Sequence, residues 1–304
     1  MFDPTTIVAS AFGTYLSELY LQHFSTRKPQ YATFIGGAAR LVMERLANSD
    51  ALYHNAEHTM MVTLAGQQII RGRLLAKALQ PEDWLHYTVA LLIHDIGYVR
   101  GTCSGDRRDA FVINEAGETV TPPRGASDAF LGPFHIERAK IYARERFGPS
   151  EYIDEERIAR AIEYTRFPVP PGPDHADTDS EPALVRAADL IGQMGDPFYR
   201  RKTNALYQEF VETGVAQQLG YSSPMDVVER YPDFFWAHVQ PYIGPALRYL
   251  ELTIEGKVWV AQLYNHIFQV EYKASHLGPF PGPQAEGPGD GARPPARMPR
   301  PDAR

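Results

Sequence analysis

Histidine and aspartate residues occur at five positions whose types and spacing favour metal chemistry. They are His54 and His58 in YHNAEH, His94 and Asp95 in LLIHDIGY, and Asp189 in RAADLIGQ. Imidazole and carboxylate groups together form a ligand set suited to Mg²⁺, Mn²⁺, Fe²⁺, Ni²⁺ or Zn²⁺. The sequence therefore predicts a site for a divalent metal ion.

The apolar surroundings of these residues support the same prediction. His94 and Asp95 lie in one of the most apolar stretches of the chain, and Asp189 lies on an Ala/Leu/Ile-rich segment. A buried carboxylate without a partner costs several kcal/mol, so a cationic group should meet it. The side chains of adjacent residues on a helix point about 100° apart. Two such side chains can bind one ion only where neighbouring helices share an interior with them. We therefore expect the two aspartates to meet His58 and His94 where three helices converge.

Composition limits the class of protein that can carry such a site. The chain has 304 residues, of which 44% are hydrophobic and 22% charged, as in soluble globular proteins. A net charge of −7 argues against stable binding to nucleic acid, and no apolar run is long enough to cross a membrane. Cys103 is the only cysteine, which excludes a disulfide scaffold and a thiolate zinc site. The first residues lack a secretory or import signal, so we expect a cytoplasmic protein.

Most of the chain shows the three-to-four-residue apolar spacing of helices, so we expect an all-α fold. Expected helices include stretches near Tyr15, Leu41 and Val62–Leu75, then Trp84–Ile96, Ile136–Phe147, Glu155–Thr165, Pro182–Gln193, Thr203–Leu219 and Pro241–Lys273. Only Phe111–Val120 could form a short hairpin. Histidines on apolar faces are more often core residues than ligands, and we interpret His86, His238 and His266 in that way.

Three segments interrupt this pattern. Residues 100–133 mix Gly, Pro, Ser and charge, and a loop of that length inside a domain is often functional, such as a lid over a site. Residues 167–182 contain five prolines and form another loop. Residues 277–304 are rich in Pro and Gly with few apolar side chains, so we expect a disordered tail. Residues 1–276 are then expected to form a single helical domain.

The pattern HxxxH…HD…D resembles the HD-domain metal-dependent phosphohydrolases over residues 50–200, and YHNAEH and HDIGY resemble the group that includes cyclic-nucleotide phosphodiesterases. The resemblance implies an HD-type helical bundle and a defined set of roles. The implied ligands of the first ion are His58, His94, Asp95 and Asp189. Asp95 would also bridge to a second ion, and His54 would protonate the leaving oxygen. Asn55 is placed to cap the helix that carries His58.

Further residues near this pattern have candidate roles as well. His135, in GPFHIERAK, would contact a second ion, as extra histidines do in binuclear members of the family. Arg138, one turn further on, could hold a phosphate oxygen, although a solvated helix charge is the plainer interpretation. Thr165 resembles part of an IxxT segment near the substrate. The chain departs from animal phosphodiesterases at residues 96–98, which read Ile-Gly-Tyr instead of Asp-His-Pro, and only Gln269 is offered for their base-binding glutamine.

These observations predict a metal-dependent phosphohydrolase acting on a small phosphorylated substrate, either a phosphodiester or a nucleotide-type ester. Such chemistry uses a divalent ion to lower the pKa of its bound water to about 7. Two alternatives remain open: an HD-type di-iron oxygenase, and a metal- or nucleotide-binding regulatory module without catalysis. The aromatic segment Tyr231–Leu250 is interpreted as core or as the surface of a homodimer.

Overall fold

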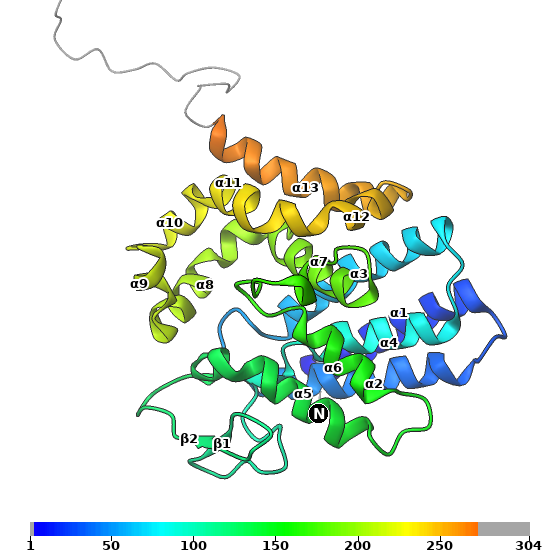
Figure 1. The fold of residues 1–304 in the computed structure, drawn as a ribbon, viewed down its shortest axis with the longest axis horizontal. Helices are drawn as coiled ribbons and strands as arrows, with labels where there is room; N and C mark the ends of the chain where they lie inside the picture. Colours follow the sequence, from blue (N-terminus) through cyan, green and yellow to red (C-terminus); the bar gives the residue numbers. More distant parts are fainter. Residues whose placement is uncertain (1–2, 273–304) are drawn as a thin grey trace, which may run out of the picture.

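The computed structural model describes residues 3–272, which form an assembly of helices with one small hairpin (Figure 1). The expected all-α class is confirmed. The hairpin lies in the 100–133 insertion, where β1 (Phe111–Val112) pairs antiparallel with β2 (Thr119–Val120), as the sequence predicted. No helix within residues 3–272 is both long and apolar enough to cross a membrane. The expected disordered tail, 277–304, lies outside the described residues.

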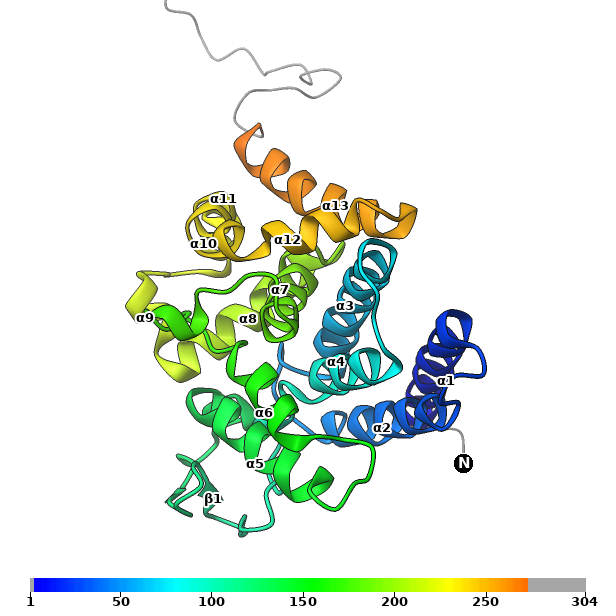
Figure 2. The same cartoon turned by 45° about the vertical axis from the view of Figure 1, so that its right-hand side comes forward.

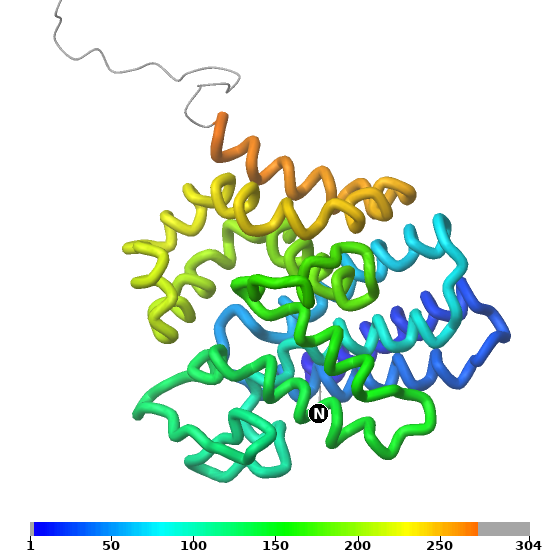
Figure 3. The backbone as a smooth tube through the Cα atoms, in the orientation of Figure 1, coloured from blue at the N-terminus to red at the C-terminus, as the bar shows by residue number. Residues whose placement is uncertain are grey.

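The elements follow one another along the chain as the colours of the tube in Figure 3 show. The α-helices are α1 (Pro4–Phe24), α2 (Gln30–Leu46), α3 (Ala56–Ala76), α4 (Pro81–Ile93), α5 (His135–Phe147), α6 (Glu155–Glu163), α7 (Glu181–Met194), α8 (Tyr199–Thr213), α9 (Val215–Leu219), α10 (Pro224–Glu229), α11 (Tyr231–Phe234), α12 (Gln240–Leu250) and α13 (Ile254–Glu271). The 3₁₀ turns are η1 (Ile96–Tyr98), η2 (Asp128–Phe134) and η3 (Pro173–His175), and η4 (Phe235–Val239) is a π-helical turn.

Helix α4 lies at the centre of the packing. Its residues from Leu85 to Ile93 are all buried, because this segment is apolar on every side. Helices α3 and α4 lie between the α1–α2 pair and the α12–α13 pair, as the turned view shows (Figure 2). Helix α7 packs along α3 and also contacts α4. These three contacting helices carry the predicted metal ligands.

Small residues set the distance between α3 and α7. A Cβ atom on Gly192 of α7 would lie 2.5 Å from the Cα atom of Val62 on α3. A Cβ atom on Gly66 of α3 would lie 2.3 Å from a methyl carbon of Leu91 on α4. Since real side chains never approach so closely, glycine at both positions lets the three helices come together.

The structure divides two segments that the sequence pattern treats as single helices. Thr203–Leu219 breaks at Gly214, whose φ of 79° is left-handed, and becomes α8 and α9. Pro241–Lys273 breaks at residues 251–253. The last of these, Thr253, caps α13 with its hydroxyl, which accepts the Gly256 backbone N–H. Periodicity does not detect these breaks, because the apolar spacing continues through them. The expectation that His238 is a core residue is wrong, since its side chain is exposed.

Candidate metal centre

Three helices bring the four predicted ligands together. His58 lies in the first turn of α3, where the Asn55 side chain caps the helix and accepts the His58 backbone N–H. His94 and Asp95 follow directly after α4, and Asp189 lies in the middle of α7. The convergence that the apolar context predicted is therefore present in the fold.

The distances between the ligand atoms fit a shared ion. His58 Nε2 lies 3.3 Å from Asp95 Oδ2 and 3.4 Å from Asp189 Oδ1. His94 Nε2 lies 3.2 Å and 3.6 Å from the same two oxygens. Two atoms bound to one ion at about 2.1 Å, with angles of about 90–110°, lie about 3.0–3.4 Å apart. Three of the four distances fall in this range, and the fourth, 3.6 Å, lies just above it. His58, His94 and Asp189 place ligand atoms within 4.8 Å of one another, and so do His54, His58 and Asp95. The cluster therefore contains two overlapping groups that could hold an ion.

Two buried polar atoms at this point support the same interpretation. Within residues 3–272, His94 Nε2 and Asp95 Oδ2 have no hydrogen-bond partner. His94 Nδ1 lies 2.8 Å from the carbonyl oxygen of Leu91. A ring N–H donated to a backbone carbonyl is the usual support for a histidine that binds metal through its other nitrogen. Buried polar atoms are nearly always satisfied, so a cation between these atoms fits the site.

The electrostatics show how strongly the cluster holds positive charge. Burial alone would lower the pKa of His94, but the carboxylates of Asp95 and Asp189 outweigh it and raise that pKa well above 6.5. Burial alone would raise the pKa of both aspartates, but the neighbouring histidines hold the pKa of Asp95 well below 3.8 and lower that of Asp189 to about 2. Metal binding would replace protons here, because histidine ligands must be neutral.

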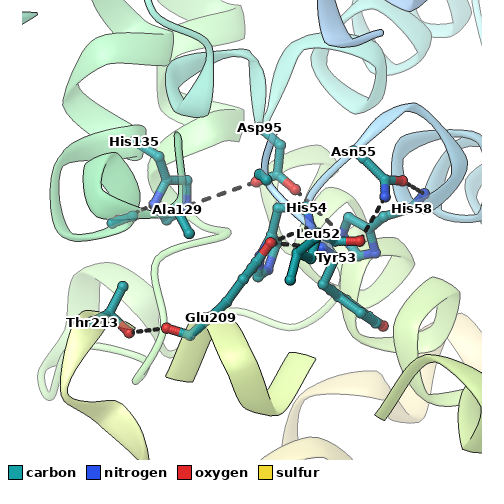
Figure 4. Close-up of polar contacts among 12 residues, drawn as sticks. Leu52, Tyr53, His54, Asn55, His58, Asp95, Ala129, His135, Glu209 and Thr213 are labelled. Atoms are coloured by element: carbon teal, nitrogen blue, oxygen red, sulfur yellow. Dashed lines mark hydrogen bonds and ion pairs between the residues drawn. The ribbon is translucent and has the colours of Figure 1, made fainter. Parts of the chain in front are cut away.

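His135 approaches the cluster from another side (Figure 4). This first residue of α5 places Nε2 3.8 Å from Asp95 Oδ1, while Asp95 Oδ2 faces His58 and His94. Its Nδ1 lies 2.5 Å from the Gly132 carbonyl oxygen. Burial lowers the pKa of His135, which favours the neutral ring that metals bind. The role of His135 toward a second ion stays a prediction, but its position beside Asp95 suits it.

His54 is held by a residue that sequence reasoning missed. Its Nδ1 lies 2.5 Å from Oε2 of Glu209 on α8, and Glu209 Oε1 accepts the backbone N–H groups of Tyr53 and His54. Burial alone would lower the pKa of His54, but Glu209 raises it to about 9. A pKa of about 9 favours the cationic form of the His54 ring at neutral pH. The sequence feature that could have indicated Glu209 is its carboxylate on the apolar face of a helix, three residues after Leu206.

Tyr98 is the second site residue that the sequence did not reveal. Its ring stacks on His54, with centroids 4.6 Å apart, and on His135, also at 4.6 Å. Tyr98 occupies the last of the three positions at which the chain departs from the phosphodiesterase pattern. It thus lies between the two histidines that flank the candidate metal centre.

A cavity of about 430 Å³ adjoins these groups. Its lining includes the predicted residues His54, Asp95, His135, Thr165 and Asp189, together with Tyr98 and Glu209. The 100–133 insertion contributes Ala129, Gly132 and Pro133 to the wall. The Thr165 hydroxyl donates to the carbonyl oxygen of Ile162 at 2.8 Å.

The expectation that Arg138 holds a substrate phosphate is wrong. The side chain is fully buried and does not line the cavity. Its guanidinium donates to both carboxylate oxygens of Asp106 and to the carbonyl oxygens of Gly97, Val99 and Val112. These five hydrogen bonds use all five N–H groups of an arginine. Arg138 therefore anchors the insertion to the core.

Gln269, considered as a base-binding residue, also lies away from the site. It accepts a hydrogen bond from Arg200 at 3.3 Å and does not line the cavity. His175, in the proline-rich loop 167–182, lies with its ring tilted against Tyr164, with centroids 5.2 Å apart, and does not line the cavity either. Neither side chain therefore belongs to the candidate metal centre.

Comparison with known proteins gives a family for the chain. Neither the curated proteins nor the solved structures include a significant match. A family model described as Npun_R2479-like matches residues 2–273, which include all of the part that the structure describes. The chain therefore belongs to the Npun_R2479-like family.

Proposed function

We propose that this protein is a metal-dependent hydrolase of a phosphate ester, with a divalent ion held by His58, His94, Asp95 and Asp189. The observation that carries the proposal is that these four side chains lie together and that two of their own buried atoms, His94 Nε2 and Asp95 Oδ2, have no hydrogen-bond partner within residues 3–272. The cavity beside them gives a substrate access to the ligands and to a cationic histidine. The resemblance to HD-domain phosphohydrolases, and the expected cytoplasmic location, belong to the same proposal.

The donor set defines what the ion would contribute. Two imidazoles and two carboxylates suit Mg²⁺, Mn²⁺, Fe²⁺, Ni²⁺ or Zn²⁺. When bound, such an ion supplies Lewis-acid polarisation of a phosphoryl oxygen and makes water ionise at neutral pH. Asp95 Oδ2 faces His94 and Asp95 Oδ1 faces His135, so Asp95 and His135 would be the residues that hold a second ion.

His54 is the residue we assign to proton transfer. Hydrolysis forms a bond from a water oxygen to phosphorus and breaks the bond to the ester oxygen, which must gain a proton as it leaves. Because Nδ1 of His54 is hydrogen-bonded to Glu209, Nε2 is the ring nitrogen that would give that proton. Glu209 keeps the ring charged and fixes its orientation. General acid catalysis of this kind contributes typically about 10²–10⁴-fold.

A second candidate function is a di-iron oxygenase, which the position of His135 beside Asp95 favours. Two ions, rather than one, would be required, and both would be iron. Oxygen consumption without release of phosphate would identify this activity. The same measurement separates it from the phosphohydrolase.

The test uses the full chain, stripped with chelator and reloaded in turn with each of the five metals. Metal content is measured by elemental analysis, and turnover with p-nitrophenyl phosphate and bis-p-nitrophenyl phosphate. The expected result is one or two bound ions and metal-dependent release of p-nitrophenol. Asp189→Asn should lose both metal and turnover, and His175→Ala, outside the cavity, should lose neither. Bound metal without turnover of either ester would overturn the proposal and favour a regulatory module.

A further inference from the structure

Beyond the metal-site residues, the cavity is walled mainly by apolar side chains. These come from the loop after α6, from α7, from the α8–α9 segment and from α11. They are Phe167, Pro168, Val169, Leu190, Leu206, Phe210, Val215, Leu219 and Phe234. The ring centroids of Phe167 and Phe234 lie 5.5 Å apart. A ligand that enters beside the metal cluster would therefore meet aromatic and aliphatic surface.

Both arginines that line the cavity already have partners within the protein, although Nε of Arg186 has none among the described residues. Arg166 donates to the carboxylates of Glu163 and Glu137. Arg186 donates to the carbonyl oxygens of His175 and Asp177, and its guanidinium lies over the rings of Tyr164 and Tyr242. Arg186 is only 2% exposed. Within the described part of the chain, no lysine lines the cavity. A chain of phosphate groups would therefore meet no lysine in this wall, and both of its arginines already pair with other groups of the protein.

The neutral polar residues of the wall are also few. Thr165 and Thr213 line the cavity, but their hydroxyls donate to backbone carbonyl oxygens, at 2.8 Å in each case. Gln193 and Gln218 are the remaining neutral polar side chains among the described residues of the wall, apart from the Tyr98 hydroxyl. A ligand with many hydroxyl and ring donors would leave most of them unpaired, which costs binding free energy.

Three of these apolar residues, Phe167, Pro168 and Leu219, are exposed. Phe167 is 46% exposed and Leu219 is 38% exposed. Large apolar side chains left open to water at a cavity favour a ligand that covers them. Such a ligand must be apolar itself to gain from that contact.

We infer that the ester group of the substrate is apolar: the protein takes a single phosphoryl group esterified to an alkyl or aryl alcohol, rather than a nucleotide. This inference rests on the proposed function, since the metal cluster would hold the phosphoryl end. The apolar body then fills the wall formed by α8, α9, α11 and the 167–169 segment. Each methylene group buried there should improve kcat/KM about fourfold until the wall is filled.

The experiment compares esters that share one leaving group. Metal-loaded full-length protein is assayed with p-nitrophenyl phosphodiesters of methanol, butanol, hexanol and octanol, and with the p-nitrophenyl ester of thymidine 5′-monophosphate. The same alcohols are also offered as phosphate monoesters, beside thymidine 5′-monophosphate. We expect kcat/KM to rise with chain length and to exceed that of the thymidine ester. Equal rates along the series, or a preference for the thymidine ester, would overturn the inference.

A binding measurement separates this inference from the hydrolase proposal. Methylphosphonate, octylphosphonate and thymidine 5′-monophosphate are titrated calorimetrically into the metal-loaded protein. If octylphosphonate binds more tightly than thymidine 5′-monophosphate but no ester is hydrolysed, the hydrolase proposal is wrong and the inferred ligand class is supported. If thymidine 5′-monophosphate binds more tightly and esters are hydrolysed, the inferred ligand class is wrong and the hydrolase proposal is supported.

Variants locate the effect in the cavity wall. Phe210→Ala on α8 and Leu219→Ser on α9 should each lower the octyl-to-methyl ratio of kcat/KM several-fold. A merely structural defect would lower both rates together and leave that ratio unchanged. Phe268→Ala is the matched control, because this phenylalanine is 52% exposed on α13 and does not line the cavity. An unchanged ratio in both wall variants would contradict the inference.

Discussion

Oε2 of Glu209 lies 2.5 Å from Nδ1 of His54, which precedes it by 155 residues in the chain. The other oxygen of the carboxylate accepts the backbone N–H groups of Tyr53 and His54. Helix α8 is thereby tied to the segment that leads into α3. The same helix supplies Leu206 and Phe210 to the cavity wall, so the proposed proton donor and the proposed substrate wall depend on one element.

Replacing Glu209 by glutamine should change the pH dependence of turnover. Glu209 raises the pKa of His54 to about 9, so wild-type His54 stays protonated until the pH approaches that value. In Glu209→Gln the pKa falls, and the loss of rate with rising pH should begin at lower pH. The measurement is kcat against pH with an alkyl ester, whose leaving group needs the proton. Glu18→Gln, exposed on α1, is the control.

Removing the proposed acid itself should separate rate from metal binding. His54→Ala should retain its metal and lose about 10²–10⁴-fold in turnover of poor leaving groups. p-Nitrophenyl esters should lose less, because p-nitrophenolate leaves without a proton. Elemental analysis and the two kinds of ester check this expectation. Full turnover of the alkyl ester by this variant would show that the acid is another group.

Metal binding should appear as thermal stability. A ligand that binds only the folded state, at 100 times its Kd, adds about 2.7 kcal/mol to the free energy of unfolding. His58→Ala and Asp189→Asn should lose this increment, while His135→Ala should lose at most the part due to a second ion. Melting curves with and without chelator measure the increment. An unchanged increment in Asp189→Asn would place the ion elsewhere.

The stabilisation by metal should grow with pH. The folded pKa of His94 is raised above its ordinary value of 6.5, so in the metal-free protein its contribution to stability is present below pH 6.5 and is lost as the pH rises through the folded pKa. Metal competes with that same proton, so affinity falls as the pH drops. We expect the metal-dependent rise in Tm to be larger at about pH 8 than at about pH 6. A rise independent of pH would show that binding releases no proton.

Sequence reasoning found the proposed metal ligands because their context is unusual. A carboxylate in the apolar run around Asp95, or on the Ala/Leu/Ile-rich helix of Asp189, needs a cation, and this requirement is readable without coordinates. All-α architecture and the hairpin in the insertion were predictable from apolar spacing in the same way.

The partners across the fold were not predictable from spacing. Glu209 and His54 meet only because α8 turns back beside α3, and nothing in the local pattern fixes that geometry. Arg138 illustrates the opposite error: a charge near a histidine motif suggested substrate contact, whereas its role is decided by Asp106, 32 residues away. Contacts between distant parts of the chain decide the roles of both Glu209 and Arg138, and apolar periodicity carries no information about such contacts.

Arg138 should matter for stability. Its carboxylate partner Asp106 is only 2% exposed, and removing one member of a buried pair costs about 3–5 kcal/mol. Arg138→Met should lose that much in urea unfolding. Arg144→Met is the matched variant, because its partners Glu115 and Glu156 are about 60% exposed and such pairs contribute at most about 1 kcal/mol. Equal losses in the two variants would contradict the structural role of Arg138.

Adding a methyl group at Gly192 should weaken metal binding and stability together. The new Cβ atom would lie 2.5 Å from the Cα and 2.8 Å from the backbone nitrogen of Val62, and backbone atoms cannot move aside singly. Helix α7 must then shift away from α3, which separates Asp189 Oδ1 from His58 Nε2, now 3.4 Å apart. Overpacking of this kind costs about 1–3 kcal/mol.

Gly37→Ala provides the comparison for Gly192→Ala. This glycine lies inside α2, and beyond the backbone of its own helix no atom comes within 4 Å of the position that a Cβ would take. Alanine there should therefore stabilise the helix by up to about 1 kcal/mol. Its metal affinity should stay at the wild-type value, because α2 carries none of the ligands. Urea unfolding and metal titration of both variants provide the measurements. If Gly192→Ala binds metal as tightly as Gly37→Ala, the spacing of α3 and α7 does not set the geometry of the ligands.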